Sequence, residues 1–186
     1  MPDVSAIWER IERWYANHVP QRLAQLGPPA SDEDLAALQV ATGLSLPDDV
    51  RASLSRHNGN SFIYGFDYLN TGWAAEVWQR LTTRLEQGQF QGLIPGDTSG
   101  RRFAPVWWSR KWLPVAEHRA GTIMCVDTAP GPQGVIGQVL ELDLSDEGPA
   151  LTGWRSFAEW LDAYRGDLEA GKYQVDQYGN LNRIAE

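Results

Sequence analysis

The sequence predicts an α+β fold in which N-terminal helices and a C-terminal helix pack on a largely antiparallel β-sheet. Three observations predict it. Apolar residues at helical spacing dominate the first sixty residues, aromatic and β-branched runs dominate residues 106–142, and helical spacing returns near residue 157. Helices therefore precede and follow the strands, whereas a parallel sheet would require helices and strands to alternate.

Three main helices are expected before residue 60. The first carries apolar side chains at three- and four-residue spacing between residues 4 and 15. The second begins after Ser31, a capping residue followed by three acidic residues that suit the positive end of a helix, and ends at Gly43. The third begins at Pro47, which suits a first helical position, and stops at Asn58 and Gly59.

The rest of the chain predicts strands and two more helices. An aromatic strand or hairpin arm over residues 61–69 leads into a helix that ends near Gly88. The polar, glycine-rich residues 88–105 predict a long surface loop within the same domain. Alternation and turn residues predict further strands over residues 106–108, 112–116, 122–127 and 135–142. A capping pattern at Ser156 starts a last helix, and a strand follows it.

Length, charge and composition predict one globular domain that spans residues 1–186. A chain of 186 residues with 42% hydrophobic residues buries a sizeable core without a disulfide or metal. Its formal net charge of −8 disfavours nucleic acids and anionic membrane surfaces. No apolar stretch reaches the roughly 18 residues that span a bilayer. The single Cys125 and a start without a signal-like apolar run favour the cytoplasm.

The residues that resemble catalytic or metal-binding motifs are expected to have structural roles. Residues 166–173 match the glycines and lysine of a phosphate loop, but Tyr173 replaces the magnesium-binding hydroxyl and the segment ends a helix. The three histidines lie far apart in the sequence. Cys125 lies in an apolar strand that buries its thiol, and Asp127 is expected to accept backbone hydrogen bonds in the next turn. The sequence therefore predicts no catalytic residue, metal or cofactor.

Seven short motifs follow one another along the chain. In order they are Pro29-Ala30-Ser31, Leu35, Gly43-Leu44-Ser45-Leu46-Pro47-Asp48-Asp49, His57-Asn58-Gly59, Trp112-Leu113-Pro114-Val115-Ala116, Cys125-Val126-Asp127 and Gly137-Gln138-Val139. Their order resembles the SMI1/KNR4 family of the SUKH superfamily over roughly residues 8–164. The resemblance implies an α+β fold with helices packed on a largely antiparallel sheet, in agreement with the element pattern.

The resemblance implies a function by binding a protein partner and brings no active site. In bacterial members it implies immunity proteins that neutralise toxins of polymorphic or contact-dependent systems, and in fungal members a regulator of cell-wall glucan synthesis. Toxin immunity is our main hypothesis, because the net charge of −8 suits a basic toxin domain as the partner. Cell-wall regulation is the alternative. A small enzyme or ligand-binding domain is a third hypothesis, motivated by the aromatic strands and the many carboxylates.

The tryptophans and an acidic cluster supply the candidate partner-binding residues. Alternation along a strand puts Trp107 and Trp108 on opposite faces, so that one packs in the core and Trp108 is the candidate for the surface. Asp143, Asp146 and Glu147 form an acidic cluster whose alternative role is a solvated loop. The other tryptophans left for recognition are Trp73 and Trp154.

Overall fold

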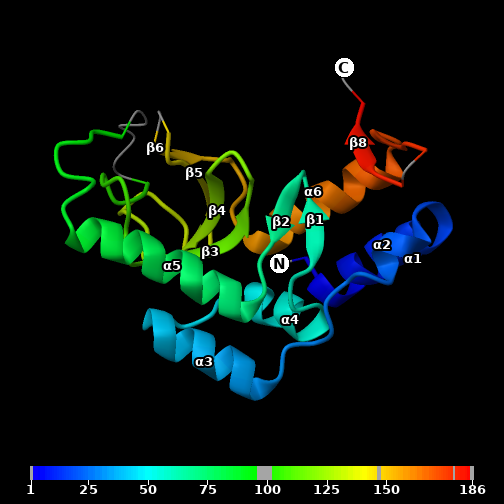
Figure 1. Ribbon diagram of the computed structural model, residues 1–186, viewed down its shortest axis with the longest axis horizontal. Coiled ribbons are helices and arrows are strands. Elements are labelled where there is room, and N and C mark those ends of the chain that lie inside the picture. The colour runs from blue at the N-terminus through cyan, green and yellow to red at the C-terminus, as the bar shows by residue number, and fades with distance from the viewer. Residues whose placement is uncertain (1, 96–101, 146–147, 178, 185–186) are drawn as a thin grey trace.

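The computed structural model describes residues 2–95, 102–145, 148–177 and 179–184 (Figure 1). The helices of these residues are α1 (Val4–His18), α2 (Pro20–Leu23), α3 (Asp32–Thr42), α4 (Asp48–Arg56), α5 (Thr71–Glu86) and α6 (Phe157–Glu169). The strands are β1 (Ser61–Ile63), β2 (Phe66–Tyr68), β3 (Trp112–Glu117), β4 (Thr122–Asp127), β5 (Val139–Asp143), β6 (Gly148–Leu151), β7 (Tyr173–Val175) and β8 (Leu181–Arg183).

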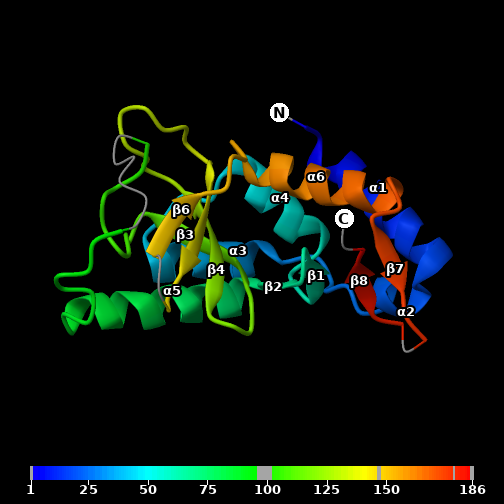
Figure 2. The same ribbon diagram turned by 90° about the horizontal axis from the view of Figure 1, so that it is seen from above.

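Six strands form one antiparallel sheet in which neighbours in the chain are neighbours in space, in the order β1-β2-β3-β4-β5-β6. β7 and β8 form a separate hairpin. α5 lies along one side of the large sheet, and α6 begins on the other side and runs on beside α1 (Figure 2). The central strands β3 and β4 are therefore buried on both faces. The predicted α+β fold is confirmed.

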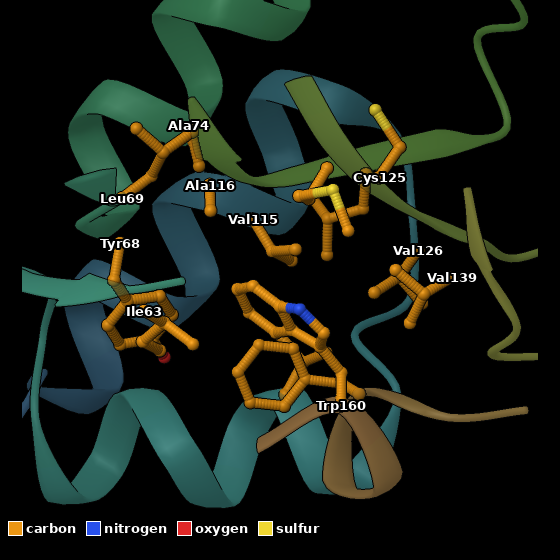
Figure 3. Packing of buried hydrophobic residues seen from close by; sticks show 14 of the residues in the cluster. Ile63, Tyr68, Leu69, Ala74, Val115, Ala116, Cys125, Val126, Val139 and Trp160 are labelled. Atoms are coloured by element: carbon orange, nitrogen blue, oxygen red, sulfur yellow. The ribbon is translucent and has the colours of Figure 1, made fainter. Parts of the chain in front are cut away.

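Trp160 of α6 lies at the centre of the core between the helices and the sheet. Figure 3 shows its indole pointing from α6 towards Val115 of β3, with Ile63 on one side and Val126 on the other. All four side chains are buried. A fully buried tryptophan removes about 200 Å² from water, so this packing contributes roughly 3–5 kcal/mol to holding α6 on the sheet.

Asp49 links the start of α4 to the start of α6. Its carboxylate is buried, and Oδ2 accepts a hydrogen bond of 2.9 Å from the amide of Ala158. Oδ1 accepts one of 2.9 Å from the amide of Val50. Both amides belong to the first turn of a helix, where unpaired N–H groups and the helix dipole favour a negative charge. The third predicted helix is thus confirmed as α4, and its second acidic residue joins two helices.

Two of the predicted strands differ from the structure. The backbone over residues 106–108 is irregular, because the amide of Val106 donates to the carbonyl of Ala104 in a local turn and not to a neighbouring strand. The strand predicted over residues 135–142 begins only at Val139, since a turn precedes it. In both places aromatic or β-branched composition suggested a strand, while local turn bonds determine the backbone.

Candidate binding cleft

The motif His57-Asn58-Gly59 positions the start of α5. Asn58 Oδ1 accepts from the amide of Thr71 at 2.8 Å, and its Nδ2 donates to the Thr71 hydroxyl at 3.3 Å. Gly59 has φ +74° and approaches Asn70 so closely that an added Cβ would lie 2.4 Å from the Asn70 nitrogen. Only glycine combines this backbone angle with this contact. The motif therefore fixes where the first turn of α5 begins.

A charged network joins the same motif to α1. Arg56 Nε and Nη2 each donate to the Glu12 carboxylate at 2.8 Å. His57 Nε2 lies 2.8 Å from Glu12 Oε1, and its Nδ1 lies 3.0 Å from the carbonyl oxygen of Gly27. The hydrogen bond from Arg56, together with that from His57, holds the pKa of Glu12 below its usual 4.5 although partial burial acts in the opposite direction. The network thus fastens the end of α4 to α1.

The hairpin of β1 and β2 presents an aromatic ring and a carboxylate on its outer face. Its turn residues, Tyr64 and Gly65, both have positive φ, as in the two-residue turns that match the twist of antiparallel strands. This turn places Phe62 directly opposite Asp67. Side chains alternate along a strand, and the neighbouring Ile63 is fully buried on the core face. Phe62 and Asp67 therefore lie side by side on the outer face.

A cleft of about 370 Å³ lies between this hairpin, the end of α2 and the first turn of α5. It is lined by Gln25, Asn60, Ser61, Phe62, Asp67, Tyr68 and Trp73, and we call it the aromatic cleft. Phe62 and Trp73 are both partly open to solvent, at 37% and 41% exposed. The Asp67 side chain makes no hydrogen bond or ion pair within the part of the chain that the structure describes.

This combination of groups suits a positively charged side chain. The guanidinium of Arg22 already lies 5.2 Å from the centre of the Phe62 ring, so this ring holds a cation within the chain itself. Aromatic faces attract ammonium and guanidinium groups, and a carboxylate beside them adds charge and hydrogen bonds. The aromatic cleft can therefore bind a lysine or arginine side chain, with Asp67 as its counter-charge.

Trp108, the predicted partner-binding tryptophan, lies in the core. It is 1% exposed, and its Nε1 donates to the hydroxyl of Thr82 on α5 at 3.4 Å. Trp107 is also buried, at 7% exposed. The prediction that Trp108 reaches the surface is wrong, because the irregular backbone lets both rings turn inward where a strand would have placed them on opposite faces. Of the other two candidates, Trp73 is exposed and Trp154 is half-buried.

The predicted acidic cluster starts at the last residue of β5. Asp143 is half-buried and accepts from the amide of Ser145 at 2.8 Å and from its hydroxyl at 2.6 Å. Asp146 and Glu147 lie outside the described residues. Gly148, which follows them, approaches the Trp107 ring so closely that an added Cβ would lie 3.0 Å from it. The structure therefore brings Trp107 next to β6, as part of the core.

The residues that resemble catalytic or phosphate-binding motifs in the sequence have structural roles. Asp127 accepts from the amide of Ala129 at 3.1 Å, as predicted, and burial raises the pKa of its carboxyl. Burial also raises the pKa of the Cys125 thiol, which keeps it protonated and unreactive. Residues 166–173 include the end of α6, as predicted. Within the described ranges, no group of three or more His, Cys, Asp or Glu residues is placed to hold a metal ion.

Among the described residues, no helix is both long enough and apolar enough to cross a membrane.

Comparison with known proteins decides the family. The profile of the SMI1 / KNR4 family (SUKH-1) matches residues 29–163. The chain belongs to the SMI1/KNR4 family. The matched residues run from the segment before α3 into α6, and they include the aromatic cleft except for Gln25. The predicted resemblance is confirmed.

Several fungal proteins are similar to this SMI1/KNR4 chain. It is 30% identical over 200 residues to the cell wall biosynthesis/cell cycle regulator smi1 of Schizosaccharomyces pombe, covering 98% of the chain and 40% of that protein. It is 26% identical to the cell wall assembly regulator SMI1 of Saccharomyces cerevisiae, covering 91% and 41%. It is 25% identical to the glucan synthesis regulatory protein of Neurospora crassa, covering 98% and 42%. The chain spans less than half the length of each.

These relatives overturn the main functional hypothesis. All three are fungal, and their names describe regulators of the cell wall or of glucan synthesis. The prediction of a toxin-immunity protein that binds a basic toxin domain is therefore wrong, and cell-wall regulation is the better supported alternative. The motifs are shared by the whole SMI1/KNR4 family, and a net charge of −8 indicates only that a partner is basic. Neither observation could distinguish bacterial immunity proteins from fungal cell-wall regulators.

Proposed function

We propose that this chain is a protein-binding domain that regulates cell-wall glucan synthesis by binding rather than by catalysis. The supporting observation is its similarity to the S. pombe cell-wall regulator over 98% of its length. In this proposal residues 1–186 work as one domain, in keeping with the single cluster of buried apolar side chains among the described residues. A cytoplasmic location is part of the proposal and agrees with the free, buried thiol of Cys125.

In this proposal the aromatic cleft binds a basic segment of the partner protein. The Asp67 carboxylate, which has no partner among the described residues, provides the charge, and the exposed Phe62 and Trp73 rings provide flat apolar faces. Interfaces draw much of their affinity from aromatic anchors and from charge pairs that lose contact with water on binding. The net charge of −8 also attracts a basic segment before contact and speeds association.

An exchange experiment in S. cerevisiae tests the regulatory role. The part of the cell wall assembly regulator SMI1 that aligns with this chain is replaced by residues 1–186, in a strain that lacks the intact protein. We expect the chimaera to restore wall glucan towards the content of the strain with the intact regulator. A chimaera that accumulates normally yet leaves glucan at the content of the deletion strain contradicts the proposed function.

Variants of the same chimaera test the site. Asp67→Asn removes the charge of the aromatic cleft, and Trp73→Ala removes an aromatic face. Val40→Ala is the matched control, because this residue of α3 is 84% exposed and lies outside the cleft. We expect both cleft variants to lose glucan restoration and the control to keep it. Full restoration by all three variants would keep the regulatory role and reject the aromatic cleft as the binding site.

A further inference from the structure

A second hollow lies at the opposite edge of the sheet, beside β6. Its volume is about 350 Å³, and it shares no lining residue with the aromatic cleft. Arg102 and Arg155 line it, and none of its described lining residues is acidic. In a chain with a net charge of −8, a hollow with this lining concentrates positive charge at one place.

Backbone contacts fix the position of Arg102. Its carbonyl oxygen accepts from Gln138 Nε2 at 2.8 Å and from the amide of Gly131 at 3.1 Å. Gly134 packs against it so closely that an added Cβ would lie 1.9 Å from the same oxygen. The guanidinium makes no ion pair in the described residues. The chain therefore holds the backbone of Arg102 tightly and leaves the N–H donors of its side chain available for a ligand.

Arg155 is held in the turn that leads into α6. Its amide donates to Glu159 Oε2 at 2.7 Å, and the hydroxyl of the next residue, Ser156, caps the helix by accepting from the amide of Glu159 at 3.1 Å. Its guanidinium likewise has no acidic partner in the described ranges. Two arginines whose guanidinium groups have no acidic partner in the described ranges thus line the same hollow from different segments of the chain.

We propose that this hollow binds a phosphorylated serine or threonine of a protein partner. Guanidinium groups match phosphate oxygens with paired N–H donors, and two of them balance the charge of about −2 on a phosphate ester. Trp154 and Leu151 provide apolar surface for the residue beside the phosphate. Because the lining residues Arg102, Gly153 and Arg155 are exposed, the peptide chain can continue on both sides of the phosphorylated residue. A long polyanion such as nucleic acid is disfavoured by the net charge of the protein.

Two matched peptide libraries test this site on the whole chain. Both carry four random residues on each side of a central position, which is phosphoserine in one library and serine in the other. We expect the chain to retain the phosphorylated library, and a peptide selected from it to bind at least about tenfold more tightly than its unphosphorylated form. Equal retention of both libraries would overturn the proposal, as would stronger competition by ATP or inorganic phosphate than by the selected phosphopeptide.

Charge-neutral variants assign the binding to the hollow. Arg102→Gln and Arg155→Gln leave the backbone bonds of both residues intact, and each should weaken phosphopeptide binding about tenfold. Arg119→Gln is the matched control, because this exposed arginine also lacks an ion pair among the described residues and lies outside the hollow. The control should bind as the parent does. An equal loss in all three variants would show attraction by general charge and would reject the site, as would full binding by both hollow variants. Thermal unfolding confirms that each variant is folded.

Discussion

The family motifs and the aromatic cleft use polar side chains in opposite ways. In the motif segments, Asp49 is buried against the first turn of α6, and His57 is held between Glu12 and a backbone carbonyl. In the aromatic cleft, Asp67 has no partner in the described residues and Trp73 is open to solvent. The residues that identify the family thus build the fold, whereas the candidate recognition site lies mostly between the motifs.

This difference has an energetic consequence. A buried polar group that loses its partner keeps the cost of leaving water, so substitutions in the motifs should lower the free energy of unfolding. Trp73 is exposed, and the half-buried Asp67 has no partner to lose in the described residues, so substitutions in the aromatic cleft should change binding and leave stability nearly unchanged. Four predictions test this separation.

Asp49→Ala should have the largest effect on stability. It leaves the amides of Ala158 and Val50 without their buried acceptor, which should cost about 3 kcal/mol of unfolding free energy. The neighbouring Asp48 is exposed, and Asp48→Ala should cost less than about 1 kcal/mol. Urea unfolding of both variants measures the difference. Equal losses from the two aspartates would contradict the structural role of the motif.

Gly59→Ala and Gly43→Ala separate a close contact from backbone strain. Both glycines have positive φ, but an added Cβ meets nothing within 4 Å at Gly43 and lies 2.4 Å from the Asn70 nitrogen at Gly59. We expect a cost of about 1 kcal/mol at Gly43 from strain alone, and about 2 kcal/mol more at Gly59 because the start of α5 must move. Similar melting temperatures for the two variants would argue against the close packing of the motif on α5.

The Glu12 network predicts a defined pH dependence. The folded protein holds the pKa of Glu12 below 4.5, so the stability from its ionised form is present above that pH and is lost as pH falls through the lower folded value. The unfolding free energy of the parent chain should therefore be about 1 kcal/mol higher than that of Glu12→Gln near pH 6, and this difference should shrink below pH 4.5. Unfolding at a series of pH values measures it, with the exposed Glu9→Gln as control. A gap that stays constant with pH would contradict the role of Arg56 and His57.

Arg22 should weaken the binding of a basic peptide to the aromatic cleft. Its guanidinium stacks on Phe62 and adds positive charge near the site for a basic segment. Arg22→Gln should therefore raise the affinity for an arginine-containing peptide about threefold. Arg13→Gln removes the same charge from an exposed position on α1 and should have less effect. Calorimetric titration compares them, and an equal gain in both variants would point to net charge instead of the local contact.

The sequence predicts those parts of the fold that depend on local signals. Ser31 and Gly43 mark the two ends of α3, because capping is decided by neighbouring residues. The segment containing Trp107 and Trp108 was not predictable in this way. Large aromatic side chains suit a strand and a core-facing loop equally well, and only contacts with distant residues decide between them.

The aromatic cleft was only partly predictable for a related reason. Trp73 has a sequence signal, since it falls outside the apolar positions of its helix. The pairing of Phe62 with Asp67 depends on a two-residue turn at Tyr64 and Gly65, which lacks the usual Asn-Gly or Asp-Gly signal. A shift of the turn by one residue would have placed these side chains on different faces.

The central claim is that the motifs build the fold and that the aromatic cleft binds a basic segment. The most direct test measures both binding and stability of the Asp67→Asn variant. The probe is a pair of random peptide libraries with a central arginine or its neutral analogue citrulline. We predict that the parent chain prefers the arginine library about tenfold, and that Asp67→Asn loses this preference while its unfolding free energy changes by less than about 0.5 kcal/mol. An unchanged preference for arginine, or a stability loss as large as that of Asp49→Ala, would contradict it.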